Sequence, residues 1–147
     1  MDTEGLLRLL KEHNVDFVII GATAFPVYGY ARATLDIDIF IRPVRSNAER
    51  ALEALNEFGY DMTDVAVEDL LTKKLLIRQY AVEAVIHPFV KGVSFDQVWR
   101  NRVEAKFGKT AVFFASLDDL IEMKRSTGSP QDLQDLKYLM RLKEKGE

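Results

Sequence analysis

The chain has 147 residues, of which 48% are hydrophobic and 29% charged, a composition typical of one compact globular domain, here expected over residues 1–147. The 20 Lys and Arg residues and the 23 Asp and Glu residues give a formal net charge of −3. The chain therefore lacks the overall positive charge of a general nucleic-acid-binding protein, although a local basic patch is still possible. The absence of cysteine excludes a disulfide framework and a thiolate zinc site.

The sequence offers no signal for a membrane span or for export. The longest stretch without a charged residue, 17–31, is shorter than the ~20 residues of a transmembrane helix and is interrupted by glycine and proline. Asp2 and Glu4 stand where a signal peptide would carry positive charge. We therefore expect a cytoplasmic protein without a membrane partner.

The N-terminal third predicts a helix, a strand, a second helix and a second strand. Leucines at helical spacing indicate a helix over 3–13, and the apolar run 16–20 indicates a buried strand that ends at Gly21. A helix is expected over 23–30, with its proline tolerated only in the first turn. Strict alternation over 35–41 predicts a strand. One face of it carries Leu35, Ile37, Ile39 and Ile41, and the other carries Asp36, Asp38 and Phe40.

The middle of the chain predicts one long helix followed by a pair of strands. Ser46 and Glu49 have the spacing of a capping box for a helix over 48–58, which Gly59 would end. A short helix or turn is expected over 67–74, and strands are expected over 75–79 and 81–87. In the second of these strands, Val82, Ala84 and Ile86 lie opposite Glu83, Val85 and His87.

Three serines predict helix starts in the C-terminal third. Ser94, Ser116 and Ser129 each precede a helical pattern, and Pro130 suits the first position of the last helix. A tight turn at 107–110 would lead into a strand over 111–114. The last helix is expected to turn Leu133, Leu136, Leu139 and Met140 inward. The elements together predict a mixed α/β (α+β) domain with a helical C-terminus.

Asp36 and Asp38 are the first candidate for chemistry. Two carboxylates two residues apart on a strand project from one face roughly 6–7 Å apart, and such a concentration of negative charge favours a cation between them. Carboxylate oxygens favour Mg²⁺ or Mn²⁺, whereas only His13 and His87 are available as nitrogen ligands for zinc. The alternative is that both carboxylates lie on the solvated face of an edge strand, which is the commoner fate of an isolated Asp-x-Asp.

The surroundings of this pair carry a family resemblance. The segment from Gly21-Ala22 to Arg32-Ala33-Thr34-Leu35-Asp36-Ile37-Asp38 resembles the polymerase-beta-like nucleotidyltransferase superfamily, most closely small bacterial members related to toxin–antitoxin and abortive-infection nucleotidyltransferases. In that family an apolar strand ends in Gly-Gly or Gly-Ser, and an Arg-x-Thr-x-Asp-hydrophobic-Asp strand supplies metal ligands. The resemblance implies the nucleotidyltransferase fold, with a mixed sheet flanked by helices.

Later segments extend the resemblance to most of the chain. Glu83, within Val82-Glu83-Ala84-Val85-Ile86, stands where the family has its third carboxylate, usually an Asp. Lys124 and the segment 128–136 look like the family's Lys-bearing helix and its Gly-Arg-x-Lys-Asp-x-x-Asp ending. The chain departs from the pattern at four positions, which are Ala22, Glu83, Ser129 and Gln131.

The resemblance also implies roles for the matching residues. Asp36, Asp38 and Glu83 would be the catalytic residues and the ligands of two Mg²⁺ or Mn²⁺ ions, with Glu83 assisting deprotonation of the attacking hydroxyl. The remaining matches would bind the nucleotide triphosphate: Gly21 and Ala22 through backbone N–H groups, Arg32 and Lys124 through charge, and Thr34 within the motif.

Each of these residues also has a simpler interpretation. Gly21 would serve as a turn glycine, Arg32 as a solvated loop cation and Lys124 as the polar side of an amphipathic helix. His87 shares a strand face with Glu83 and would border the site in one interpretation, whereas the favoured one is a surface histidine at a strand end before Pro88. Asp132 and Asp135 would be favourable charges in the first turn of a helix.

The resulting functional hypothesis is a metal-dependent nucleotidyltransferase that moves a nucleoside monophosphate from an NTP such as ATP to a hydroxyl of an acceptor, with release of pyrophosphate. The acceptor is a protein, an RNA or a small molecule, and a partner protein or a homodimer is a further expectation because little chain remains for an acceptor domain. The first alternative is a catalytically weak or silent, antitoxin-like binding protein of the same fold. The second is a module that senses a metal or a nucleotide.

Overall fold

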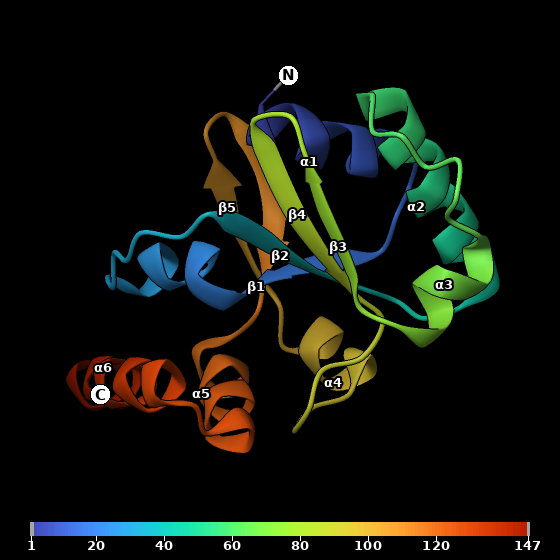
Figure 1. The fold of residues 1–147 in the computed structure, drawn as a ribbon. Helices are drawn as coiled ribbons and strands as arrows, with labels where there is room; N and C mark the ends of the chain where they lie inside the picture. The colour runs from blue at the N-terminus through green and yellow to red at the C-terminus, as the bar shows by residue number, and fades with distance from the viewer. Residues whose placement is uncertain (1, 147) are drawn as a thin grey trace.

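The computed structural model describes residues 2–146 and contains one six-stranded mixed sheet, in the order β3-β4-β2-β1-β6-β5 (Figure 1). The strands are β1 (Phe17–Ile20), β2 (Asp36–Ile41), β3 (Leu75–Gln79), β4 (Val82–His87), β5 (Val103–Phe107) and β6 (Thr110–Phe114). The helices are α1 (Thr3–Glu12), α2 (Arg45–Phe58), α3 (Val67–Thr72), α4 (Phe95–Arg100), α5 (Leu117–Thr127) and α6 (Pro130–Lys145).

The helices form two groups around the sheet. Helix α1 packs against α2, and α5 packs against α6. Figure 1 shows the C-terminal pair, in orange and red, well apart from α1 and α2. None of the helices in the described part of the chain is both long enough and apolar enough to cross a bilayer.

Strand β2 lies at the centre of the sheet and has neighbours of opposite direction. It pairs with β1 in antiparallel and with β4 in parallel orientation. The register places Asp36 opposite Glu83 on β4 and Asp38 opposite Ile20 on β1. Because side chains of paired residues point to the same face of a sheet, this register sets the carboxylates of Asp36 and Glu83 side by side.

The predicted α/β class, the helical C-terminus and most predicted elements are confirmed, but the expected helix over 23–30 is wrong. The chain instead forms two short 3-10 turns, Gly21–Thr23 and Phe25–Tyr28. Gly29, with φ at +95°, ends the second turn and directs the chain toward β2. No α-helix follows β1, so only a short turn presents its backbone to the end of that strand.

Three further expectations about single elements are corrected. Helix α2 begins at Arg45 after Val44 and has no side-chain cap, so the capping box of Ser46 and Glu49 does not form. Strand β5 was not predicted. On α6, Leu133 is 54% exposed and Met140 is 40% exposed, so the helix turns Leu139 and Leu136 inward and leaves the other two outside.

The two faces of β2 also differ less in solvent exposure than the alternation predicts. Phe40 lies on the same face as the two aspartates but is completely buried, with its ring edge against Phe95 of α4 at a centroid distance of 5.2 Å. Leu35 precedes the strand and is 90% exposed. Only the first half of the carboxylate face of β2 is therefore open to a ligand.

Asn47 links α2 to the ends of β1 and β2. Its side chain is completely buried. The Oδ1 atom accepts a hydrogen bond from the backbone N–H of Asp16 at 2.7 Å, and Nδ2 donates to the carbonyls of Asp16 and Arg42, each at 3.0 Å. A single amide thus satisfies three backbone groups where the two central strands meet α2.

We expect Asn47→Ala to lower the free energy of unfolding by about 2–4 kcal/mol, because it removes three hydrogen bonds and leaves the backbone N–H of Asp16 without the Asn47 oxygen. Urea unfolding followed by circular dichroism measures the change. Asn56→Ala, on the exposed side of the same helix, is the control and should shift the midpoint little. Equal effects of the two substitutions would contradict the role given to Asn47.

Candidate active site

Asp36 and Glu83 form the centre of the candidate site. They begin strands β2 and β4 and lie directly opposite each other in the parallel ladder. A hydrogen bond to Asp36, burial, and repulsion from the Asp36 charge all raise the pKa of the Glu83 carboxyl, while the nearby charge of Arg78 opposes the rise. Two carboxylates placed this close together are suited to share a proton or a cation.

Asp38 lies beside this pair and is held by two neighbours. Its Oδ1 atom is 2.8 Å from Nε2 of His87 on β4. Gly21, with φ at +69°, lies so close that a Cβ atom there would come within 2.6 Å of the Oδ2 atom of Asp38. The glycine is therefore needed both for its backbone conformation and for the space that Asp38 occupies.

Arg32 and Lys124 belong to a buried charge network centred on Asp135 of α6. The Asp135 side chain is fully buried and accepts hydrogen bonds from Nε and Nη2 of Arg32, each at 2.9 Å, and from the hydroxyl of Tyr30 at 3.0 Å. Gln131 donates a further bond at 3.1 Å, and the Nζ atom of Lys124 lies 3.4 Å away. Such a fully buried carboxylate is stable only when it is matched in this way.

Lys124 also pairs with Asp132, its Nζ atom 3.0 Å from Oδ1. Burial alone would raise the pKa of the Asp132 carboxyl, but hydrogen bonds from Thr127, Ser129 and Lys124, together with the Lys124 charge, lower the pKa below its ordinary value. The network thus joins the loop before β2 to both C-terminal helices.

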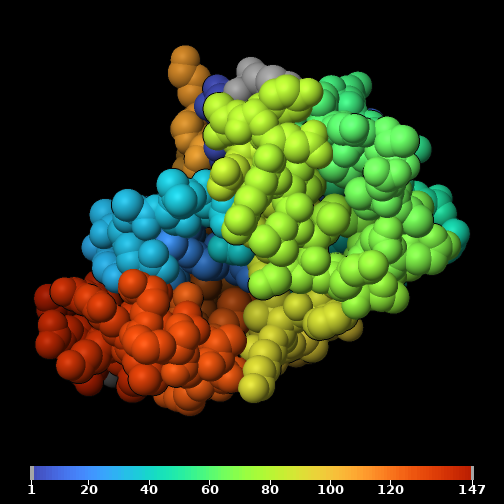
Figure 2. All heavy atoms as spheres, viewed as in Figure 1, coloured from blue at the N-terminus to red at the C-terminus, as the bar shows by residue number. Residues whose placement is uncertain are grey.

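A cleft of about 300 Å³ opens at the start of β2 and β4. Its lining includes Asp36, Glu83, Arg32, Thr34 and Ala22. The hydroxyl of Thr34 donates to the carbonyl of Asp36 at 3.0 Å, so this side chain shapes the loop. In Figure 2 the surface is hollowed between the blue and cyan segments that follow β1 and the yellow-green β3–β4 hairpin.

The donor set of the cleft suits a hard divalent cation such as Mg²⁺ or Mn²⁺. It offers carboxylate oxygens, and the pKa of Glu83 is raised by a hydrogen bond to Asp36, by burial and by the Asp36 charge, the last of which a cation would offset. Within residues 2–146, no three acidic or histidine side chains are already arranged as a complete metal site. Asp36 and Glu83 are paired for such a role, whereas Asp38 is engaged by His87.

The six-stranded mixed sheet with its flanking helices has the nucleotidyltransferase fold. The crystal structure of the lincosamide antibiotic adenylyltransferase LnuA with lincomycin bound superposes with a TM-score of 0.65 at 15% sequence identity, over 97% of this chain and 98% of that chain. A family model described as "Nucleotidyltransferase of unknown function (DUF6036)" matches residues 2–142, and the chain belongs to that family. A search of curated proteins finds no match.

Two residues near the site have contacts that the sequence did not predict. His87 was interpreted as a surface histidine, yet its side chain is 16% exposed and contacts Asp38. Its position four residues after Glu83, on the same strand face, was the available signal. Asp135 was interpreted as a first-turn charge, and no local pattern could indicate its bond with Arg32, 103 residues away.

The two aspartates of β2 should respond differently to neutralisation. Because the folded protein raises the pKa of Glu83, the repulsion lowers stability as the pH rises above the ordinary carboxyl range, so Asp36→Asn should leave the melting temperature at pH 7 in EDTA unchanged or higher. Asp38→Asn weakens the hydrogen bond to His87 and should lower the melting temperature by about 2–4 °C. Thermal unfolding in EDTA measures both, and a clear loss in Asp36→Asn would contradict the repulsion.

The Asp132 network predicts a pH-dependent stability. Because the folded pKa of Asp132 is lowered, its contribution is present above the unfolded pKa near 4 and is lost as the pH falls below it. Asp132→Asn should therefore lower the free energy of unfolding by about 1–3 kcal/mol at pH 7 and by progressively less below about pH 4. Urea unfolding at several pH values between 7 and 3 measures the free energy of unfolding, with Asp64→Asn at an exposed position as the control. A deficit that does not vary with pH would contradict the assignment.

Proposed function

We propose that the protein transfers a nucleoside monophosphate from an NTP to a hydroxyl group of an acceptor, with release of pyrophosphate. The observation that carries the proposal is the direct opposition of Asp36 and Glu83 on β2 and β4, beside Asp38 and the Gly21 turn. Membership of a nucleotidyltransferase family and the fold shared with an adenylyltransferase support the same reaction class.

The three carboxylates have the chemistry to hold Mg²⁺ or Mn²⁺ and to act on the attacking group. When bound, the cation would neutralise charge on the triphosphate and favour ionisation of the acceptor hydroxyl. Asp36, Asp38 and Glu83 would supply its protein ligands. Glu83, whose pKa is raised by a hydrogen bond to Asp36 and by burial, is suited to accept the proton of the hydroxyl as its oxygen attacks the α-phosphorus and the bond to the β-phosphate oxygen breaks.

The triphosphate would lie along the Gly21 turn. Gly21 and Ala22 offer backbone N–H groups at the end of β1, close to Asp38. Because only a 3-10 turn of three residues follows, these N–H groups rather than a helix dipole would contact the phosphates. Arg32, which lines the cleft and keeps its guanidinium on Asp135, would add a positioned donor at the cleft wall.

A second candidate is a catalytically weak or silent binding protein of the same fold, such as an antitoxin. The observation in its favour is that Arg32 and Lys124, the two cations expected to offset triphosphate charge, are already paired with Asp135 and Asp132. The family's Arg and Lys are replaced by Ser129, which caps α6, and Gln131, which hydrogen-bonds to Asp135. These four contacts stabilise the fold and leave less free positive charge for a nucleotide.

Label transfer distinguishes the two candidates. The purified protein is incubated with Mg²⁺, a cell extract and each of the four α-labelled NTPs in turn, and labelled products are separated by size. We expect transfer from at least one NTP and a loss of at least about 100-fold in Asp36→Asn and in Glu83→Gln, because both variants remove a carboxylate from the reacting centre.

Asp64→Asn is the matched control and should transfer label at the wild-type rate. Persistent transfer by Asp36→Asn would refute the assigned site. Absence of label from every NTP, with no rise in melting temperature on addition of Mg²⁺ and NTP, would favour the silent binding protein.

A further inference from the structure

A groove runs between the loop before β2 and the outer face of α6. One part has a volume of about 630 Å³ and is lined by Gly29–Arg32 on one side and by Gln131, Tyr138, Arg141 and Lys145 on the other. A second hollow of about 520 Å³ continues over the same helix past Lys137. We call the two together the α6 groove. Arg32 lines both the α6 groove and the carboxylate cleft, so the two hollows adjoin at this residue.

Three cations line this groove in a row. Lys137, Arg141 and Lys145 follow one another at intervals of four residues, and all three are exposed. Within residues 2–146, no carboxylate lies within ion-pair distance of these side chains, whereas Lys143, on another side of the helix, pairs with Asp118 at 2.9 Å. Like charges at this spacing destabilise an isolated helix, so the row has no evident structural benefit.

An aromatic stack ends in the same groove. The buried ring of Phe25 stacks on Tyr30 at 5.2 Å, and Tyr30 stacks on Tyr138 at 4.8 Å, both pairs with interplanar angles of 12°. The hydroxyl of Tyr30 is fixed by Asp135, so the stack is anchored in the charge network. Tyr138 is 44% exposed, and the guanidinium of Arg141 lies 5.8 Å from its ring centre. A flat apolar surface thus adjoins the row of cations.

This combination has the chemistry of a site for a single-stranded nucleic acid. The cations lie about 6 Å apart along the helix axis and extend over about 12 Å, which suits successive phosphates of one strand better than a single small anion. Exposed aromatic rings beside a positive groove bind the bases of single strands by stacking, with little sequence preference. The net charge of −3 makes this local positive surface distinct from the rest of the chain.

We propose that the α6 groove binds a single-stranded nucleic acid whose terminal hydroxyl is the acceptor of the transferred nucleotide. The identity of the acceptor rests on the proposed function, whereas binding of the strand does not. The strand would place its phosphates along Lys137, Arg141 and Lys145, stack a base on Tyr138 and present its end past Arg32 to Asp36 and Glu83. The hydroxyl oxygen then bonds to the α-phosphorus of the NTP, its proton passes to Glu83, and pyrophosphate leaves.

Binding is tested without nucleotide or metal. A fluorescein-labelled single-stranded RNA of 12 nucleotides and mixed sequence is titrated with the full chain in EDTA, and anisotropy is followed from 50 to 300 mM KCl. We expect binding whose logarithmic salt slope is about −2, as three phosphate contacts on a single strand predict. Lys137→Glu/Arg141→Glu should weaken binding at 50 mM salt by at least about tenfold and flatten the slope.

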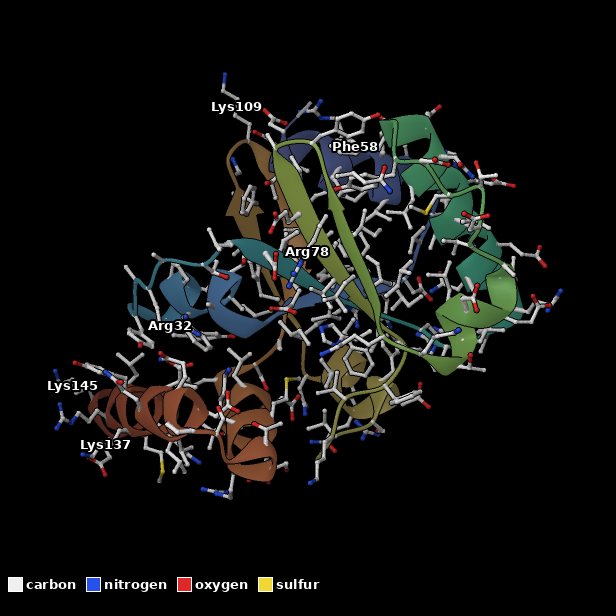
Figure 3. The ribbon with its side chains drawn as sticks, viewed as in Figure 1. Arg32, Phe58, Arg78, Lys109, Lys137 and Lys145 are labelled. Atoms are coloured by element: carbon white, nitrogen blue, oxygen red, sulfur yellow. The ribbon has the colours of Figure 1, made fainter. Side chains whose placement is uncertain are left out.

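The control for charge is Lys106→Glu/Lys109→Glu in the β5–β6 hairpin, where both side chains are exposed. Figure 3 shows Lys109 at the opposite end of the molecule from Lys137 and Lys145, with Arg32 close to α6. This control should bind like the wild type. Tyr138→Ala should weaken binding by about tenfold, and Tyr138→Phe, which keeps the ring, should restore it. Circular dichroism and melting temperature establish that each variant is folded.

Any of three outcomes would overturn the proposal. The anisotropy of the RNA would not change with up to 200 µM wild-type protein, the groove and hairpin variants would lose equal binding affinity, or AMP would compete for the protein as strongly as unlabelled RNA. The label-transfer assay is read separately. RNA binding without transfer would refute the proposed function alone, and transfer without RNA binding would refute the α6 groove as the acceptor site alone.

Discussion

The parallel pairing of β2 with β4 is the constraint on which the candidate site depends. Asp36 and Glu83 come from strands separated by α2, α3 and β3, and only their register sets them opposite each other. A shift of one residue would turn Glu83 to the other face and replace it with an apolar neighbour. The next pair in the ladder, Ile37 and Ala84, is buried and faces the core. Burial of this apolar face favours the register that sets the two carboxylates side by side on the other face.

The charge network of Asp135 complements this arrangement. A carboxylate with no exposed surface binds α6 to the loop that enters β2, and its partners include both cations that a nucleotide site would otherwise use. The protein therefore employs Arg32 and Lys124 to stabilise the walls of the cleft. Positive charge reappears on the outer face of the same helix, where Lys137, Arg141 and Lys145 have no carboxylate within ion-pair distance among residues 2–146 and where an aromatic stack reaches the surface. The charges buried in the network and the charges exposed along the groove thus lie on two faces of α6.

The local features were predictable from the sequence, and the long-range ones were not. The alternation over seven residues predicted which side chains of β2 share a face. Ser94, Ser116 and Ser129 cap their helices as expected. The partner strand of β2 could be proposed only through the family resemblance, since register depends on distant packing. Strand β5 was missed although Val103, Ala105 and Phe107 alternate with charged residues. The helix expected after β1 failed because Pro26 and Gly29 favour short turns over a continuous helix.

The separation of 103 residues between Arg32 and Asp135 bears on how the protein assembles during translation. Arg32 leaves the ribosome about one hundred residues before its buried counter-charge, and β6, the parallel neighbour of β1, also appears late. The nascent chain can pair β1 with β2 early, but the loop before β2 acquires its anchor only when α6 has been synthesised. A chain that stops before α6 therefore lacks the buried counter-charge that fixes Arg32 at the wall of the carboxylate cleft. The order of synthesis thus makes the geometry of this wall depend on a residue made about one hundred residues later.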